Sequence, residues 1–281
     1  MAVRIITDSA ADFSGEVAAR RRIHIVPMTV QFGSAAFIDG KSITSDVFYQ
    51  LLTRGGESPT TSQPSPAAFL RVFEAAKAAG DQAVVITISG ALSGTLQSAM
   101  IARELCEYEH ICIVDSRTAT AGMQLLVNHA CKLRDSGLDA PGIAAQLEWL
   151  RDRVRIFAVI DTLEYLRRGG RLSAVQAGLG TVTRLKPTVT LRDGAIAVVG
   201  KSFGMAAGVK NLLKHIEAHP IDDDFPSYFL YTDDKSREEL LLPGLEPRPQ
   251  RLRSCGLGPT LGTHIGPGAL GLAYIEAKKE V

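Results

Sequence analysis

Short runs of apolar, largely β-branched residues alternate with amphipathic segments through the first half of the chain. Strands are expected at residues 3–9, 24–32, 83–89 and 111–116. Each run is nearly all apolar, which is typical of parallel strands covered on both faces. Residues 66–80 predict a helix, because Ser65 is a good N-cap, Pro66 suits the first turn and Gly80 can end it. These repeated strand–helix–strand units predict a three-layer α/β/α domain around a parallel sheet.

The pattern changes in the second half of the chain. Strands are expected at residues 155–161 and 227–234, and a helix at residues 206–219. Two further β runs flank Asp193-Gly194, the strongest short signal for a hairpin. We therefore predict a second, two-layer α+β domain with a mixed sheet. The chain then divides into residues 1–158 and residues 159–281.

One stretch fits neither pattern. Residues 241–260 contain four prolines where a helix and a strand would be expected. Because proline inside a helix costs about 3 kcal/mol, we expect this stretch to be a loop. The sequence assigns it no function.

Composition and charge narrow the class of protein. The chain has 281 residues, of which 46% are hydrophobic, and a net charge of +1, which argues against non-specific nucleic-acid binding. No apolar run is long enough for a spanning helix, and the first residues lack the features of a signal peptide. The cysteines show no C-x-x-C spacing; they are Cys106, Cys112, Cys131 and Cys255. We therefore expect a soluble cytoplasmic protein without stable membrane insertion.

Polar residues follow the predicted parallel strands, where ligands of open sheets usually bind. They are Thr7-Asp8-Ser9, Ser89 and Asp115-Ser116. Two interpretations stay open for each: a ligand donor, or a cap for the following helix.

The segment Ser93-Gly94-Thr95 has the composition of an anion site. If Ser93 is the N-cap of a helix, its hydroxyl and the next free amides face one spot, and Gly94 lets a ligand approach the backbone. The spacing is neither a nucleophile elbow nor a Walker loop. The segment therefore indicates a holder of carboxylate or phosphate, with simple capping as the alternative.

Two further segments offer donors. A polar, rigid loop is expected at Thr60, Thr61, Ser62 and Gln63, and it either contacts a ligand head or only leads into the helix. His264 lies in a glycine-rich segment that predicts a loop, where a histidine is more often exposed or functional than packed.

Charged and metal-binding patterns are less informative. Arg167, Arg168 and Arg171 surround two glycines after a short helical pattern. They suit an anion or an acidic partner, or only the end of a helix, with Gly169 as its stop. His215 and His219 have the spacing of a zinc pair but lack the adjacent glutamate, so no metal is expected.

Seven segments, in order over nearly the whole chain, resemble the DegV family. They read ITDSAAD, TTSQPSP, ISGALSGTLQSA, VDSRTAT, LEYLRRGGRLS, LKPTVTLRDG and GTHIGPGALGLAY. The resemblance implies a two-domain α/β protein that binds a long-chain fatty acid in the cleft between its domains. It also implies a carrier without catalytic residues or cofactor, which presents the fatty-acid carboxylate to a separate fatty-acid kinase for conversion to acyl phosphate.

The resemblance also implies roles for individual residues. Those expected at the carboxylate are Thr61, Ser93, Gly94 and His264, with Ser62 and Thr95 as possible neighbours of the head group. Arg171 is expected to face the kinase and its phosphate. Two features depart from the family pattern: Gly90 replaces a second serine after Ser89, and residues 241–260 are rich in proline.

Two other functions remain as alternatives. A stand-alone hydrolase or phosphotransferase would use Asp8 or Asp115, but no motif for such chemistry accompanies them. A binding module for another anionic metabolite would need more basic or aromatic residues near the glycine-rich segments than the sequence has.

Overall fold

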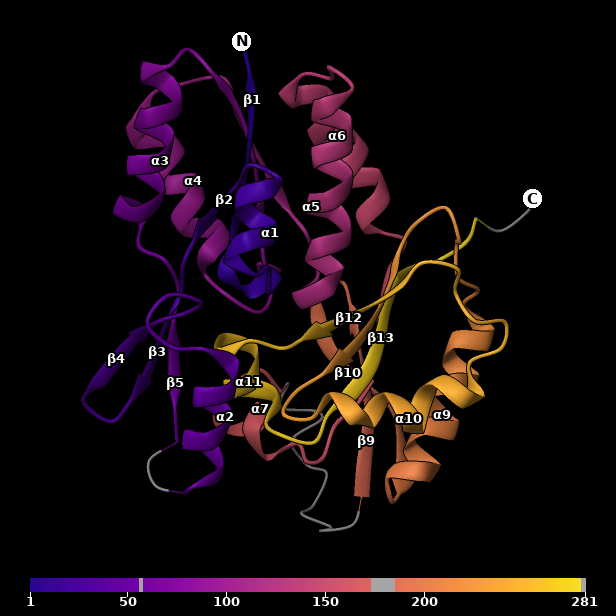
Figure 1. The fold of residues 1–281 in the computed structure, drawn as a ribbon. Helices are drawn as coiled ribbons and strands as arrows, with labels where there is room; N and C mark the ends of the chain where they lie inside the picture. The colour runs from indigo at the N-terminus through magenta and orange to yellow at the C-terminus, as the bar shows by residue number, and fades with distance from the viewer. Residues whose placement is uncertain (56–57, 173–184, 279–281) are drawn as a thin grey trace.

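The computed structural model describes residues 1–55, 58–172 and 185–278 (Figure 1). Its first part contains a four-stranded parallel sheet in the order β2-β1-β6-β7. The strands are β1 (Val3–Asp8), β2 (Ile23–Val26), β6 (Gln82–Thr87) and β7 (Ile111–Asp115). The prediction of a single strand at residues 24–32 is wrong. These residues form two strands, β2 and β3 (Thr29–Phe32), in different sheets. The first strand ends before Pro27, because proline has no N–H for a ladder.

Helices cover both faces of this sheet, which confirms the three-layer prediction. One face carries α3 (Pro66–Ala78) and α4 (Thr95–Cys106), whose apolar residues pack against Ile6 and Val85. The other carries α1 (Gly15–Arg20), α5 (Thr120–Asp135) and α6 (Ala140–Arg151). Ser65 caps α3 as predicted, since its hydroxyl accepts a hydrogen bond from the Ala68 amide.

A small antiparallel sheet lies beside the first one. It has the order β4-β3-β5, with β4 (Ala35–Ile38) and β5 (Thr60–Ser62), and α2 (Ser45–Thr53) lies between β4 and β5 in the chain. The loop expected at residues 60–63 is therefore wrong for residues 60–62. Thr61 pairs with Val30 of β3, so its position is set by a backbone ladder.

The second part contains the predicted mixed sheet, in the order β10-β9-β8-β13-β11-β12. Its strands are β8 (Val154–Val159), β9 (Leu185–Arg192), β10 (Ala195–Phe203), β11 (Ser227–Tyr231), β12 (Leu252–Gly256) and β13 (Leu270–Ile275). Helix α9 (Met205–Ala218) covers one face. The expected hairpin is present, and Asp193 and Gly194 both have positive φ, 49° and 79°. The predicted boundary at residue 158 lies within β8, which pairs only in this sheet.

The prediction that residues 241–260 form a loop is wrong. The segment begins at the end of α10 (Glu238–Leu241), which lies between short 3-10 turns at Lys235–Arg237 and Leu242–Gly244. It continues into β12, which pairs in parallel with β11, and into α11 (Pro259–Ile265). Its prolines do not interrupt these elements. Pro259 stands in the first turn of α11, where no amide is needed.

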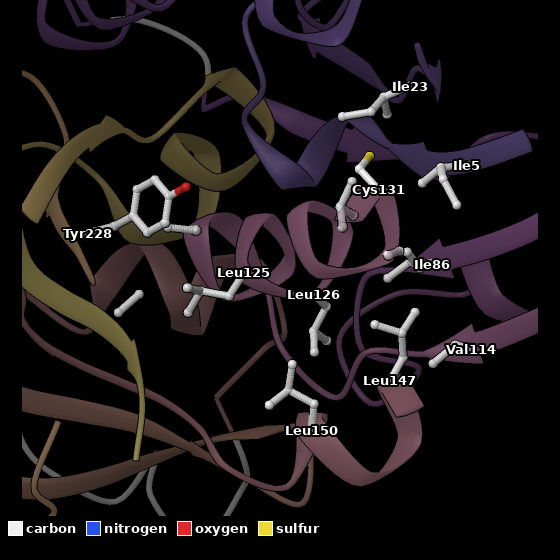
Figure 2. Close-up of a cluster of buried hydrophobic side chains, with 14 of the residues drawn as sticks. Ile5, Ile23, Ile86, Val114, Leu125, Leu126, Cys131, Leu147, Leu150 and Tyr228 are labelled. Carbon is white, nitrogen blue, oxygen red and sulfur yellow. The ribbon is translucent and has the colours of Figure 1, made fainter. Parts of the chain in front are cut away.

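The largest buried cluster joins the two parts (Figure 2). Helix α5 contributes Leu125 and Leu126, which pack with Ile5 and Ile86 of the first sheet, and Tyr228 of the second sheet belongs to the same cluster. The Asn128 side chain of α5 donates a hydrogen bond to the Tyr228 hydroxyl at 2.9 Å. One continuous core therefore holds the second sheet against the first part.

Candidate functional site

A polar cavity lies where β5, the β6–α4 connection and α11 meet. Its lining comprises Met28, Thr61, Ser62, Gln63, Ile88, Leu92, Ser93, Arg171, Ile196, Thr260, Leu261, His264 and Ile265. The volume of this cavity, counted as the space open to the centre of a water molecule, is about 350 Å³. The structure thus brings together six residues singled out from the sequence: Thr61, Ser62, Gln63, Ser93, Arg171 and His264. Gly94 and Thr95 do not line the cavity.

His264 and Thr61 line the polar cavity in direct contact with each other. The expectation of a loop around His264 is wrong, because the residue lies in α11, which packs beside α2 and α7 (Glu164–Arg168) (Figure 1). Its Nε2 atom is 2.8 Å from the Thr61 hydroxyl. This contact joins residues 203 positions apart and ties the second part of the chain to β5.

The environment keeps the imidazole of His264 neutral. Burial, with a smaller contribution from the Arg171 charge, lowers the pKa of His264 to about 4. Its Nδ1 atom is buried and has no hydrogen-bond partner among the described residues. His264 can therefore serve a ligand as a neutral hydrogen-bonding group at neutral pH.

A glycine creates the space for this ring. A Cβ atom at Gly169 would lie 2.1 Å from the His264 Nδ1 atom. Gly169 follows α7, as the sequence predicts, but its φ of −73° is open to any residue. The left-handed residue is Gly170, with φ of +70°. The glycine at 169 is thus explained by the close approach of His264.

Ser93 lines the polar cavity but does not cap α4. The predicted N-cap is wrong by one residue, because Gly94 occupies that position and α4 begins at Thr95. The Ser93 hydroxyl is 2.8 Å from the Thr95 hydroxyl and accepts a weaker hydrogen bond from the Thr95 amide at 3.3 Å. Thr95, which is fully buried, therefore orients Ser93 from behind.

Gly94 gives space to another side chain of the protein. A Cβ atom at this position would lie 2.2 Å from the Gln63 Oε1 atom. The Gln63 amide group donates hydrogen bonds to the Gly94 carbonyl at 3.2 Å and to the Ser98 hydroxyl at 3.1 Å. Gln63 lines the cavity, where the sequence suggested a possible ligand donor, and it also joins β5 to α4, which the sequence did not predict.

The three arginines near α7 have different surroundings. Arg167 and Arg168 both pair with Glu164, and these hydrogen bonds lower the pKa of Glu164 to about 2. Arg171 instead lies at the polar cavity, where its Nε donates to the Leu92 carbonyl at 3.1 Å and a second nitrogen donates to the Gly169 carbonyl at 2.5 Å. Of the three, Arg171 is the cation placed next to Ser93 and His264.

An apolar cavity adjoins the polar one. The two share Leu92, Ile196, Leu261 and Ile265. The rest of its lining is almost entirely apolar and consists of Ala119, Thr120, Ile156, Ala158, Ile160, Val189, Thr190, Leu191, Leu230, Tyr231, Leu257, Ala269 and Leu270. Its volume, counted as the space open to the centre of a water molecule, is about 80 Å³, so the apolar cavity is narrow. It lies between α5 and the inner face of the second sheet.

The polar residues at the strand ends mostly bond to the backbone. Asp8, whose pKa burial raises to about 7, accepts from the amides of Ala10 and Ile88. Asp115 accepts from the amides of Gly90 and Arg117. The Ser89 hydroxyl donates to the Gly194 carbonyl at 2.8 Å and so docks the hairpin on the first sheet. Capping and docking thus explain these residues.

Other predicted features also have structural partners. His215 stacks on Phe157, and the His219 Nδ1 atom is 2.9 Å from the Glu276 carboxylate. Among residues 1–55, 58–172 and 185–278, no three His, Cys, Asp or Glu side chains are placed to hold a metal ion. Over the same ranges, no helix has the length and apolar character needed to cross a membrane.

Comparisons with known proteins agree with this architecture. A family model described as "Uncharacterised protein, DegV family" matches residues 2–277. A DegV domain-containing protein of Caldanaerobacter subterraneus subsp. tengcongensis is 33% identical over 98% of this chain and 99% of its own.

Solved structures give the same result. A DegV family protein from Thermus thermophilus, described as fatty acid binding, is 33% identical with a TM-score of 0.87 and covers 99% of this chain and 100% of its own. A stearic acid-binding protein from Eubacterium ventriosum is 28% identical with a TM-score of 0.85 over 98% of both chains. This chain belongs to the DegV family.

Proposed function

We propose that this protein binds one long-chain fatty acid, with the carboxylate in the polar cavity and the acyl chain in the apolar cavity. The observation that carries the proposal is that the polar and apolar cavities lie against each other, since Leu92, Ile196, Leu261 and Ile265 line both. The relatives from Thermus thermophilus and Eubacterium ventriosum support it, since both are described as binding fatty acids.

The polar cavity suits a carboxylate. The hydroxyls of Thr61 and Ser93 and the neutral imidazole of His264 surround the space, and each can donate or accept a hydrogen bond. Hydrogen bonds to a charged group are worth about 1.5–3 kcal/mol each. In this proposal Ser62 is a neighbour of the head group, whereas Thr95 and Gly94 do not line the polar cavity and act through Ser93 and Gln63.

The apolar cavity supplies most of the affinity. Each buried methylene contributes about 0.8 kcal/mol, so an acyl chain of about fifteen methylenes gains at most about 12 kcal/mol before ordering costs. The narrow cavity has to widen as the chain enters. In this proposal the widening is a small displacement between its walls, the inner face of the second sheet and the start of α5.

The protein is in this proposal a cytoplasmic carrier subunit that presents the carboxylate to a separate fatty-acid kinase, which forms the acyl phosphate. Arg171 is the group assigned to the kinase and the phosphate, because it is the cation at the cavity wall. The proposal assigns the chain no catalytic residue and no cofactor.

The structure offers little to a hydrolase. A Thr61 nucleophile would need His264 as its base, but a pKa of about 4 makes His264 a weak one. The buried Nδ1 atom has no carboxylate to orient the ring among the described residues. Asp8 and Asp115 are bound to backbone amides.

Mass spectrometry of the ligand extracted from denatured, purified protein tests the central proposal. We expect a stoichiometric fatty acid of about 14–20 carbons, a length comparable to that of the acyl chain considered above. A ligand-free protein of normal stability that takes up no added fatty acid would contradict it.

A charge reversal tests the role of Arg171. We expect Arg171→Glu to retain the fatty acid and to lose phosphorylation by the kinase, measured as acyl phosphate formed from protein loaded with labelled fatty acid. Arg168→Glu is the matched control, because Arg168 is exposed and pairs within its own helix. Loss of the fatty acid itself would place Arg171 at the carboxylate instead.

A further inference from the structure

A second polar cavity, here called the basic cavity, lies between the β7–α5 connection, the end of α6 and the β9–β10 hairpin. Four arginines line it: Arg117, Arg151, Arg155 and Arg192. The volume of the basic cavity, counted in the same way, is about 540 Å³. None of its residues lines the polar cavity that holds Thr61, Ser93 and His264.

Three of these arginines keep donors for a ligand. Arg192 forms no hydrogen bond or ion pair through its side chain within the described part of the chain. Among the described side chains, the Arg117 guanidinium contacts the exposed Asp152 alone, at 3.4 Å. Arg151 donates to the Asp115 carbonyl at 2.8 Å and lies 3.9 Å from the exposed Glu148 carboxylate, and its buried Nε atom has no partner among the described residues.

The remaining charges of the cavity are accounted for. Arg155 is committed to Glu276 and to the carbonyls of Asp152 and Val154. His219 also bonds to Glu276. The acidic groups that line the cavity are Asp152 and Asp193, so the arginines outnumber them. Arg192 is therefore the least compensated charge of the cavity, and Arg117 and Arg151 each have one exposed carboxylate nearby, Asp152 and Glu148.

The geometry points to a small phosphate-bearing anion as the ligand of the basic cavity. The three arginines come from three separate elements, the β7–α5 connection, α6 and β9, and all line the same recessed space. A phosphate group has three terminal oxygens that accept in several directions, whereas a carboxylate accepts in one plane. Guanidinium groups bind such oxyanions in pairs of hydrogen bonds. A recess also focuses the field more strongly than a flat surface does.

Apolar and aromatic side chains in the lining of the basic cavity suit an organic part of the ligand. They include Ile156, Leu191 and Val199, and the rings of Phe157 and His215, which stack with their centroids 5.2 Å apart. Ile156, Thr190 and Leu191 also line the apolar cavity. An anion in the basic cavity would therefore share a wall with the proposed acyl site, although its binding does not depend on that site.

Calorimetric titration of the whole protein with inorganic pyrophosphate at low ionic strength tests this site. We expect saturable binding with one pyrophosphate per chain. Arg192→Glu and Arg117→Glu should each weaken it at least about tenfold, since each replaces a donor pair by a like charge. Both side chains are exposed, so the variants should fold and keep their fatty-acid load.

The control is Arg20→Glu on α1, which makes the same change in net charge and lies outside the cavity. It should leave pyrophosphate binding unchanged. Binding that is not saturable would overturn the assignment, and so would an equal loss in all three variants, since that is the behaviour of a general surface charge. The fatty-acid content of each sample is measured separately, so failure here is distinguishable from failure of the fatty-acid proposal.

Discussion

The two cavities that meet at Leu92 and Ile196 are built in opposite ways. The apolar cavity takes much of its wall from regular strands, where alternate residues such as Ile156 and Ala158 of β8 face the same side. The polar cavity takes single side chains from short elements that are far apart in the sequence. Many similar contacts therefore act together in the first cavity, whereas each hydroxyl or ring acts alone in the second.

Filling the apolar cavity should have the largest effect. Ala119 is 5% exposed and lines this cavity, so Ala119→Phe would occupy the room of about four methylenes. At about 0.8 kcal/mol each, the fatty acid loses about 3 kcal/mol, or more than about 100-fold in affinity. The measurement is a fluorescent fatty-acid titration, beside urea unfolding to detect overpacking.

Two variants make this test specific. Ala269→Phe fills the same cavity from the second part of the molecule and should act alike. Ala36→Phe on β4 lies on the surface and should not change binding. Unchanged affinity in both cavity variants would show that the acyl chain lies elsewhere.

Removing one hydroxyl from the polar cavity should have a smaller effect. Ser93→Ala should weaken fatty-acid binding by roughly 10- to 100-fold, since a hydrogen bond to a carboxylate is worth about 1.5–3 kcal/mol. The same titration measures it. Ser93→Thr keeps the hydroxyl and should retain most of the affinity, whereas equal affinity in wild type and Ser93→Ala would remove Ser93 from the site.

The contrast between the cavities also explains what the sequence could predict. Long apolar runs and the Asp193-Gly194 turn identified the sheets, because those signals are local. The three-residue strand β5 was missed because only its pairing with β3 makes it a strand. Strand β12 was not predicted because the four prolines of residues 241–260 were taken to exclude regular structure from the whole segment. All four lie outside the strand itself.

The candidate site was predictable as a set of residues and not as a geometry. Thr61, Ser93 and His264 were named through motifs that resemble a family, and the cavity brings them together. No periodicity could show that His264 reaches Thr61, or that Gly94 makes room for Gln63 and Gly169 for His264. These are contacts between distant segments, and they decide the chemistry of the polar cavity.

The buried state of His264 predicts a pH dependence. Its pKa is about 4 in the folded protein and about 6.5 in an unfolded chain, so the unfolded chain binds the proton more tightly. Stability should therefore fall as the pH falls from 6.5 towards 4. At pH 5 the loss relative to pH 7 is about 2 kcal/mol, and His264→Gln should abolish it.

Urea unfolding of wild type and His264→Gln at pH 7 and pH 5 measures this contribution. It is the loss of unfolding free energy between the two pH values in wild type, minus the same loss in the variant. The raised pKa of Asp8 acts in the opposite direction, because its stabilisation is lost as the pH rises towards 7, but it is present in both proteins and cancels. His110→Gln, at a partly exposed position away from the cavity, should behave like wild type. Equal pH dependence in wild type and His264→Gln would mean that the ring is solvated.

The smallest effect is expected at Gly94, and it separates two explanations of this glycine. If Gly94 leaves room for the ligand, as the sequence suggests, a methyl group there should block the head group and reduce fatty-acid affinity at least tenfold. If it leaves room for Gln63, as the contacts indicate, Gly94→Ala displaces only an exposed, flexible side chain.

We expect the second result: a loss of about 1 kcal/mol in unfolding free energy, from the hydrogen bonds of Gln63, and a change in fatty-acid affinity below about threefold. In a Gln63→Ala background the substitution should cost less stability, because no side chain remains for the new methyl group to displace.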